Sequence, residues 1–374
     1  MLTRLRVKNF KNLVDTDVAF GPFTCIAGAN GVGKSNLFDA IVFLHDLAEC
    51  PIVEAAARVR DPGARSGDVR ALFSKTAAGQ ATRMSFEADF IVPRSVTDDF
   101  GRKAKPSITF LKYKVALCLR VDGSADKDRI ELTNEELTYI QIGTATKQLG
   151  FQNSLRFRKS VISGRRYVPL ISTDQDVVKL HQDGGSSGRP FNVPARSSPK
   201  TILGGINTDS HPTVLAARRE MQSWRLLQLE PSALRRPDEY SSDSHVSVNG
   251  EHLPASLLRL GNNAAARVAN DLSELIPDVK RVSVDQDEGR RLRTLLVTGS
   301  DGIAHPARSL SDGTLRFLAL AIISADPEAG GLLCLEEPEN GIHPLAIETV
   351  IQSLSSVHNA QVLLASHSPV VLSQ

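Results

Sequence analysis

A glycine-rich segment near the N-terminus carries the residue types that bind nucleoside triphosphates. The run Gly28-Ala29-Asn30-Gly31-Val32-Gly33-Lys34-Ser35 matches the pattern G-x-x-x-x-G-K-S at every fixed position. In this pattern glycines let backbone amides curl around phosphate oxygens, the lysine neutralises the β- and γ-phosphates, and the serine hydroxyl ligates Mg²⁺. We therefore predict ATP and Mg²⁺ as cofactors, bound at the phosphates by Asn30, Gly31, Gly33, Lys34, Ser35 and Asn36.

An apolar segment near the C-terminus ends in two carboxylates. The run Leu332-Leu333-Cys334-Leu335 is typical of a buried strand, and Glu336 and Glu337 follow it. A buried strand leaves the side chains at its C-terminal end little freedom. We expect Glu336 to act through the Mg²⁺ ligand shell and Glu337 to polarise the attacking water as a general base.

Two further segments place polar residues beside a predicted element. Ser311 and Gly313 precede the predicted helix LRFLALAII. There a hydroxyl and a bare backbone can meet phosphate, but a serine can also simply cap the helix. His367 ends the predicted strand QVLLASH, and in isolation a structural histidine explains it equally well.

Hydrophobic periodicity predicts the elements that must hold these residues. Residues 2–8, VDTDVAF and FTCIAG have strand patterns, whereas SNLFDAIVFLHDLAE repeats apolar residues at helical spacing. The glycine-rich run thus lies between a strand and a helix, which is the context that supports phosphate binding. Residues 309–374 again alternate helix and apolar strand, so both ends of the chain indicate α/β organisation.

The middle of the chain has a different pattern. Segments 84–92 and 108–121 alternate as partly exposed antiparallel strands do. Residues 182–212 are rich in Gly, Ser and Pro, and we expect a long mobile loop there. Helical spacing returns at 213–229 and at 255–276, which predicts a helical subdomain.

Composition sets bounds on the class of protein. The 374 residues are 41% hydrophobic and 23% charged with a net charge of +2, which is ordinary for a globular protein and gives no global field for nucleic acid. The four cysteines have no CxxC spacing, so we expect buried thiols in a reducing compartment. No apolar run approaches the length of a membrane helix, so we expect a cytoplasmic protein without a membrane partner.

In their order along the chain, these segments resemble the ABC ATPases of the RecF/SMC group. The resemblance rests on the glycine-rich run, the signature-like LSDGT at 310–314, the acid pair, the D-loop-like ENGIHP at 339–344 and the histidine of SHSP. More narrowly, EEPENGIHP with SDG and SHSP is similar to the AAA-domain ATPases of OLD-family nucleases and Septu-type antiphage proteins. The sequence departs from transporters, which have LSGGQ and a first acid that is Asp.

The resemblance implies a dimer that closes around nucleotide. In this family the signature serine of one subunit meets the γ-phosphate held by the other subunit. Carried onto this chain, Ser311 and Gly313 act in trans on ATP held by Lys34 and its neighbours, and His367 contacts the γ-phosphate in cis. ATP then joins a homodimer across two sites, and hydrolysis releases it.

The resemblance also implies an α/β fold in which an ABC-type P-loop nucleotide-binding domain is split in sequence. We expect an ATPase core at 1–50 and 280–374 and an inserted β-rich part at 51–180. A mobile loop and a helical subdomain would occupy 181–279.

The expected function is ATP hydrolysis by a nucleotide-gated dimer in DNA maintenance or antiphage defence. One alternative is an ATP-loaded scaffold that controls a separate nuclease or toxin subunit. Another is a truncated OLD-like nuclease, because those nucleases continue into a Toprim domain after the histidine, whereas this sequence ends at Gln374. Basic residues at 102–105, 156–166, 218–225 and 290–293 could follow a DNA backbone or form solvated faces.

Two more features favour structural roles. Asp285-Gln286-Asp287-Glu288 resembles a metal-binding acidic cluster, but Gly289 follows it, and the flanking strand patterns predict the turn of a β-hairpin. Trp224 is the only tryptophan, and we expect it to lie in the core on the helix at 213–229.

Overall fold

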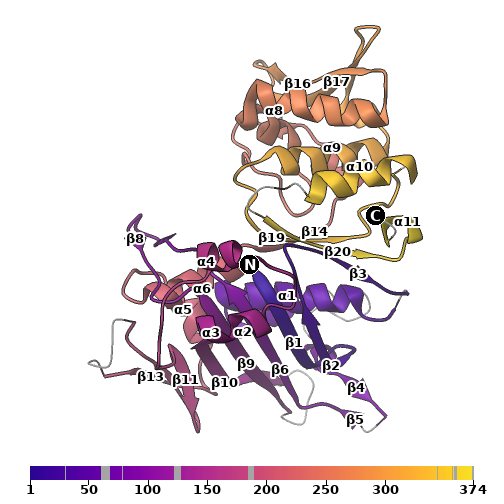
Figure 1. Cartoon of the computed structure of the whole chain (residues 1–374). Helices are drawn as coiled ribbons and strands as arrows, with labels where there is room; N and C mark the ends of the chain where they lie inside the picture. The colour runs from indigo at the N-terminus through magenta and orange to yellow at the C-terminus, as the bar shows by residue number, and fades with distance from the viewer. Residues whose placement is uncertain are drawn as a thin grey trace. The chain divides into compact units, whose positions relative to one another are not determined.

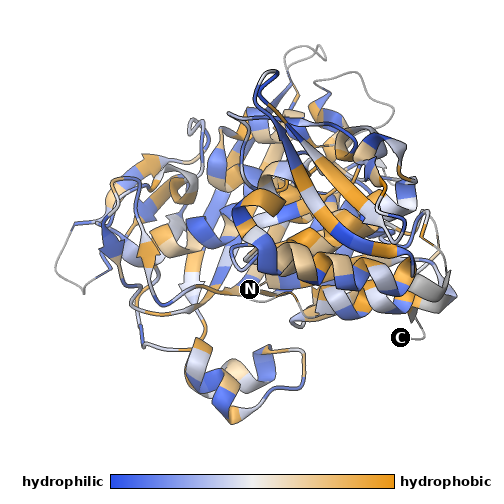
Figure 2. Cartoon of the chain, turned by 90° about the horizontal axis from the view of Figure 1, so that it is seen from above, coloured by the Kyte–Doolittle hydropathy of each residue, from blue (hydrophilic) through white to orange (hydrophobic). Residues whose placement is uncertain are grey.

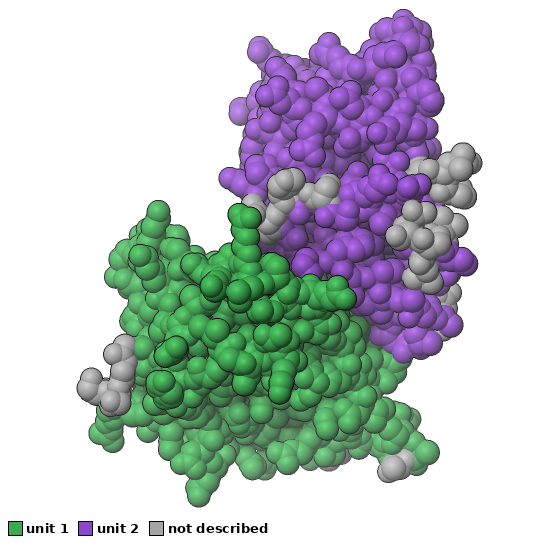
Figure 3. Space-filling model, in the orientation of Figure 1, with its two compact units in different colours: residues 1–21, 35–224 green, residues 22–34, 225–374 purple. Residues whose placement is uncertain are grey.

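The computed structural model has two compact units. It describes residues 1–29, 31–59, 68–77, 79–121, 128–183, 189–342, 344–355, 357 and 360–372. The first unit holds residues 1–21 and 35–224, and the second holds 22–34 and 225–374 (Figure 3). Figure 1 labels the helices and strands of both units.

The first unit is built on an eight-stranded antiparallel sheet. Its strand order is β13-β12-β11-β10-β9-β6-β1-β2. The strands are β1 (Leu2–Phe10), β2 (Leu13–Ala19), β6 (Arg83–Ile91), β9 (Phe110–Arg120), β10 (Arg129–Tyr139), β11 (Ile171–Asp174), β12 (Val177–Leu180) and β13 (Phe191–Pro194). Two short hairpins pair β4 (Lys75–Thr76) with β5 (Gly79–Gln80) and β7 (Val96–Thr97) with β8 (Lys103–Ala104).

Helices pack on this sheet because the strands alternate buried and half-buried residues, as β9 does from Leu111 to Leu119. Phe43 of α1 contacts Phe10 of β1 and Phe86 of β6, with ring centroids 5.8 and 5.4 Å away. The helices are α1 (Lys34–Glu49), α2 (Ile52–Arg58), the 3-10 turn η1 (Val69–Leu72), α3 (Ile142–Gln148), α4 (Leu155–Val161), α5 (Ile202–Gly205) and α6 (Pro212–Gln222).

The second unit contains two four-stranded sheets. One has the order β14-β19-β20-β3, with β3 (Phe23–Ala27), β14 (Trp224–Leu227), β19 (Gly331–Glu336) and β20 (Ala360–Ser366). The other has the order β15-β17-β16, with β18 also paired to β17. Its strands are β15 (Asp238–Glu239), β16 (Val279–Asp287), β17 (Leu292–Gly299) and β18 (Ala304–Pro306).

A helical layer links these two sheets through one hydrophobic core. Leu333 and Leu335 of β19 and Val362 and Leu364 of β20 share that core with the almost wholly buried helix α9. The helices are α7 (Pro231–Leu234), α8 (Leu253–Leu275), η3 (Ala307–Ser309), α9 (Asp312–Ala325), α10 (Pro344–Ser355) and α11 (Pro369–Leu372). None of the described helices is both long and apolar enough to cross a membrane.

Several predicted elements are confirmed. The strands expected at 84–92 and 108–121 are β6 and β9, and the helix expected at 255–276 is α8. The hairpin expected around Asp287 is formed by β16 and β17, which carry both hydrophobic and hydrophilic residues (Figure 2). Glu288 is exposed in the turn, as a solvated turn requires, whereas Asp285 is exposed within β16.

The two units divide the chain at other positions than those expected from the motifs. β1 and β2, which were expected in the ATPase core, pair with each other in the sheet of the first unit, where β1 also pairs with β6. Of the first 50 residues only 22–34 belong to the second unit, because β3 pairs with β20. Residues 225–279 also belong to the second unit.

The expected loop at 182–212 is a further correction, because its described part contains β13 and α5. A buried carboxylate explains the helical turn of α5. Glu135 of β10 accepts hydrogen bonds from the backbone amides of Ile202 and Leu203 at 2.7 and 2.9 Å. The carboxylate of Asp183 likewise binds the backbone amide of Thr213, at the start of α6. The composition of this segment indicated a loop, but Glu135, which is distant in sequence, accepts hydrogen bonds from its backbone at α5.

Trp224 lies in the core as predicted, but it does not lie on a helix. Helix α6 ends at Gln222, where the amide of Ser223 donates to the carbonyls of Arg219 and Glu220. Trp224 then begins β14, with 1% of its surface exposed and its ring 5.8 Å from that of Phe90. Strand pairing therefore overrides the helical spacing of 224–229.

Glu135 gives a prediction about stability. Its carboxyl is fully buried, and burial raises its pKa to about 7 from the ordinary 4.5. Between these two values the folded chain holds a proton that the unfolded chain has lost, so the free energy of unfolding falls as pH rises from 4.5 to 7. Glu135→Gln should remove this slope. It should also destabilise the fold by about 1–3 kcal/mol, because one amide oxygen cannot accept every bond that the carboxyl accepts.

Urea denaturation of both proteins at several pH values measures this effect. The difference between the two free energies should shrink as pH rises through 7. A difference that stays constant with pH would show that Glu135 does not titrate in this range.

Candidate nucleotide-binding site

Three parallel strands end at the same side of a sheet, and predicted site residues follow their C-terminal ends. β3 pairs with β20, and β20 pairs with β19, all in parallel. Ala365 is opposite both Ile26 of β3 and Glu336 of β19, so the three strands reach their C-terminal ends at the same level. The segments that follow them leave the sheet side by side, which is where open α/β sheets bind ligands.

The segment after β3 forms a tight loop around the Lys34 side chain. Gly31 and Gly33 have φ angles of 82° and 108°, in the left-handed region that favours glycine. The Lys34 ammonium donates hydrogen bonds to the carbonyls of Gly28 and Ala29 at 2.6 and 2.9 Å. The loop therefore holds a cation at its centre and opens into the N-terminus of α1, an arrangement suited to phosphate.

Three more residues at this loop, Ser35, Asn36 and Asn30, were predicted to bind ATP or Mg²⁺. Ser35 is exposed in the first turn of α1. Asn36 donates a hydrogen bond from its amide to the Asn12 side chain at 2.8 Å, so part of its polar group has a structural partner. Asn30 lies outside the described residues.

The segment after β19 fixes Glu337 in an unusual conformation. Its φ angle of 46° is in the left-handed region, which costs a residue with a Cβ about 1–2 kcal/mol. Its amide donates to the Ala365 carbonyl of β20 at 2.8 Å, and its carbonyl accepts from the Asn340 amide at 3.0 Å. Backbone strain of this kind is concentrated at functional sites.

Both oxygens of the Glu337 carboxylate have partners. Asn340 donates its side-chain amide to Oε2 at 2.7 Å. His367 Nδ1, after β20, lies 2.9 Å from Oε1. The predicted base Glu337 and His367, which was predicted to contact the γ-phosphate, thus contact each other. The sequence did not predict this pair. Such a pair can orient the carboxylate and exchange a proton with it.

Glu339 is a third acid at this edge, which the motif assignment gave no role. The residue is buried, and its Oε1 accepts a hydrogen bond from the Ser366 hydroxyl. Its Oε2 has no hydrogen-bond partner. Ser366 also accepts from the Ser368 amide at 3.0 Å, so Glu339 holds the turn that carries His367. The signal in the sequence was the third carboxylate of the run EEPE.

Burial acts on two thiols near these acids. It raises the pKa of Cys334 in β19 well above its usual range, and the Glu336 charge adds to the shift. It also raises the pKa of Cys25 in β3, with Glu339 as the second cause. All four cysteines are free, and these two are held as neutral thiols with a structural role.

The signature-like segment forms the N-terminus of α9. Ser311 is the N-cap residue, and its hydroxyl accepts a hydrogen bond from the Thr314 amide at 3.2 Å. Arg235 donates to the Leu310 carbonyl at 3.1 Å and pairs with Asp312. In this single chain, the described hydrogen bonds of the Ser311 side chain stay within the first turn of α9.

Gly313 is required by a close backbone contact. A Cβ built on it would lie 2.0 Å from the Gly341 carbonyl oxygen, so only glycine fits there. Arg316, one turn further along α9, donates to the Asn340 carbonyl. The signature-like segment therefore packs directly against the turn that holds Glu337.

Comparisons with known proteins agree with this geometry. A family model described as "AAA ATPase domain" matches residues 1–139, and one described as "AAA domain, putative AbiEii toxin, Type IV TA system" matches 198–373. The Old nuclease of Escherichia phage P2 is 22% identical over 397 residues, which cover 100% of this chain and 57% of that protein. The OLD nuclease of Thermus scotoductus is 54% identical over 41 residues, 11% of this chain and 8% of that protein.

The fold is found among solved structures, one of which is an SMC head. The SMC head bound to the C-winged helix domain of ScpA has a TM-score of 0.53 and 13% identity, covering 100% of this chain and 91% of that one. Fold and site together define a P-loop ATPase. More narrowly, the chain is similar to the ABC-type ATPases of the RecF/SMC-like group and to OLD nucleases. It spans 57% of the length of the phage nuclease that it matches throughout.

The contact at Gly313 gives a second prediction. Gly313→Ala should lower the thermal unfolding midpoint, because the methyl group overlaps the Gly341 carbonyl and such overpacking costs about 1–3 kcal/mol. Gly143→Ala is the matched control, since Gly143 also lies in the first turn of a helix and a Cβ there meets nothing within 4 Å. Equal midpoints for the two variants would contradict the close contact.

Proposed function

We propose that this chain binds and hydrolyses ATP at the C-terminal ends of the parallel strands β3, β19 and β20. The observation that carries the proposal is the parallel register, which aligns the Lys34 loop, the acid pair and His367. Lys34 and the loop amides hold the phosphates. Ser35 and Glu336 hold Mg²⁺, which when bound offsets the phosphate charge.

Glu337 acts as the general base in this proposal. Its carboxylate is oriented by Asn340 on one oxygen and by His367 on the other. A water that donates to Glu337 loses its proton to the carboxylate as it attacks the γ-phosphate. In this proposal His367 contacts the γ-phosphate and, 2.9 Å from Glu337 Oε1, shares the proton that Glu337 takes.

A second copy completes the site by supplying its signature-like segment. Ser311 and Gly313 begin α9, a helix of 14 residues whose positive end favours phosphate. We propose that they reach the ATP held by Lys34 of the partner subunit, so that a homodimer closes over two nucleotides. Gly313 packs on the turn that carries Glu337 of the same subunit. Closure over the nucleotide of one subunit can therefore affect the nucleotide site of the other.

DNA maintenance or antiphage defence is the setting that we propose, on the basis of the OLD-nuclease relatives. The structure weakens the case for DNA binding, because some of the basic residues predicted to contact DNA have partners within the chain. Three of the predicted basic residues serve the fold: Arg166 binds Asp183, Arg218 donates to the Ala48 carbonyl and Arg225 to the Ala329 carbonyl. The remaining cations have to supply any contact with a DNA backbone.

The second candidate is an ATP-loaded scaffold that controls a separate nuclease or toxin. The match to a family model whose description includes a toxin favours it. Salt-dependent binding of duplex DNA with and without ATP separates the two candidates. DNA binding favours the first, and copurification of an effector without DNA affinity favours the second.

Glu337→Gln tests the base. The variant keeps the size of the side chain and an oxygen for Asn340, but it cannot take a proton. We expect ATP binding to be retained and hydrolysis to fall by about 10²–10⁴-fold. Steady-state phosphate release and equilibrium nucleotide binding measure the two quantities, and an unchanged rate of release would exclude Glu337 as the base.

Mixing of two inactive variants tests the trans arrangement. Lys34→Ala removes the phosphate contact and Ser311→Ala removes the signature hydroxyl, so each homodimer should be inactive. In a mixed dimer one site combines an intact Lys34 with an intact Ser311. Random exchange should therefore restore about a quarter of the wild-type rate. Mixtures that stay inactive, although the subunits exchange, would rule out completion of the site in trans.

A further inference from the structure

Strand β16 has one edge that no described strand covers. It is the last strand in the order β15-β17-β16, and β17 pairs with its other edge. Among the described residues, no hydrogen bond reaches the backbone of 280–287 from outside this pair. A nine-residue strand with an open edge presents unpaired N–H and C=O groups to another strand.

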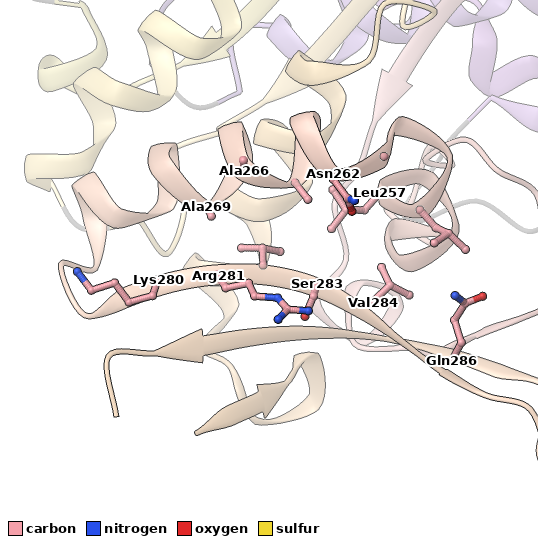
Figure 4. Close-up of a pocket in the computed structure, with 13 residues that line it drawn as sticks. Leu257, Asn262, Ala266, Ala269, Lys280, Arg281, Ser283, Val284 and Gln286 are labelled. Atoms are coloured by element: carbon pink, nitrogen blue, oxygen red, sulfur yellow. The ribbon is translucent and has the colours of Figure 1, made fainter. Parts of the chain in front are cut away.

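A groove of about 560 Å³ runs along this open edge, between β16 and α8 (Figure 4). Five successive residues of β16, Lys280 to Val284, line it. Because successive side chains point to opposite faces of a strand, a hollow lined by all of them faces the edge of the strand. The groove is therefore placed where an added strand would lie.

Helix α8 leaves room for such a strand. The α8 residues that line the groove include Gly261, Ala265, Ala266 and Ala269, which have small side chains or none. Gly261 has φ 79° and ψ −175°, which interrupts the helix at this point. A Cβ there would meet nothing within 4 Å, so the interruption does not serve a close contact within the chain.

The sequence of β16 is complementary to itself when two copies run antiparallel. Its centre reads Arg281-Val282-Ser283-Val284-Asp285. A two-fold axis through Ser283 places Val282 opposite the partner's Val284 and Arg281 opposite the partner's Asp285. Each contact occurs twice, once on each side of the axis, as an isologous interface requires. Cross-strand pairs of these two types stabilise sheets.

Burial agrees with this register. Val282 is 3% exposed in the core under α8, and Val284 packs against the same core. Arg281 and Asp285 are exposed, and neither forms an ion pair with a described residue. Pairing would join the valines of both copies on the α8 side of the sheet and the charges on its outer side.

We propose that β16 is an interface between two copies of this chain, which pair antiparallel about Ser283 into one continuous sheet. The contact does not involve the nucleotide site and therefore forms without ATP. A chain with this contact and the ATP-dependent contact has two separate interfaces, which link nucleotide-bound dimers into larger assemblies.

Disulfide cross-linking without nucleotide tests the register. Directly opposed residues in antiparallel strands have Cα atoms about 4.5–5.5 Å apart, which is within the reach of a disulfide. Ser283→Cys should give a covalent dimer when the protein is oxidised with diamide. Gln286→Cys is the matched control, because the two copies of this position would be about 20 Å apart. The wild-type protein gives the background from its four native cysteines.

Charge reversal tests the interface independently. Arg281→Glu and Asp285→Arg each oppose like charges, and each should weaken self-association without nucleotide at least about tenfold in sedimentation equilibrium. A mixture of the two variants should dimerise again, because every pair in the mixed dimer joins opposite charges. This rescue also shows that both variants fold. Arg290→Glu, in the hairpin turn outside the paired centre, should leave self-association unchanged.

Three results would overturn the proposal. They are a wild-type protein that sediments as a monomer without nucleotide, equal cross-linking of Ser283→Cys and Gln286→Cys, and charge-reversed variants that associate like the wild type. The readout needs no ATP, so failure here leaves the proposed ATPase site untouched.

Discussion

The parallel register of β3, β20 and β19 is the constraint on which the site depends. Hydrogen bonds between the strands place Ile26, Ala365 and Glu336 at one level. The three following segments cannot move apart without breaking the sheet, so the loop that carries Lys34 leaves the sheet at the same end as the acids and His367. A shift of one strand by one residue would turn its side chains to the other face and separate Lys34 from its partners.

Structural interactions hold two of the predicted site residues, Glu337 and His367. Glu337 is strained in φ, but its amide is fixed to β20 and its carboxylate to Asn340 and His367. Glu339 holds the turn of His367 through Ser366. Buried, hydrogen-bonded neighbours of this kind keep a carboxylate in one orientation and reduce the cost of reorganisation during the reaction.

In the signature-like segment, Ser311 and Gly313 can have a structural role and also bind phosphate. Ser311 caps α9, which is the simplest explanation of a Ser-x-Gly sequence before a helix. Gly313 is glycine because the Gly341 carbonyl lies where a Cβ would be. The same features leave a helix N-terminus with a hydroxyl beside it, which a phosphate from a second copy can use.

The sequence by itself determined the class of protein, because the phosphate-binding pattern and the acid pair are local and their spacing reports their chemistry. It also identified β3, β6, β9, α8 and the β16–β17 hairpin, whose periodicity is strong. Only the tertiary structure decided that β1 and β2 join the antiparallel sheet of the first unit, that Trp224 begins a strand and that 191–205 is ordered around Glu135. These outcomes, like the contact of Glu337 with His367, depend on partners distant in sequence, and no local pattern encodes such pairing.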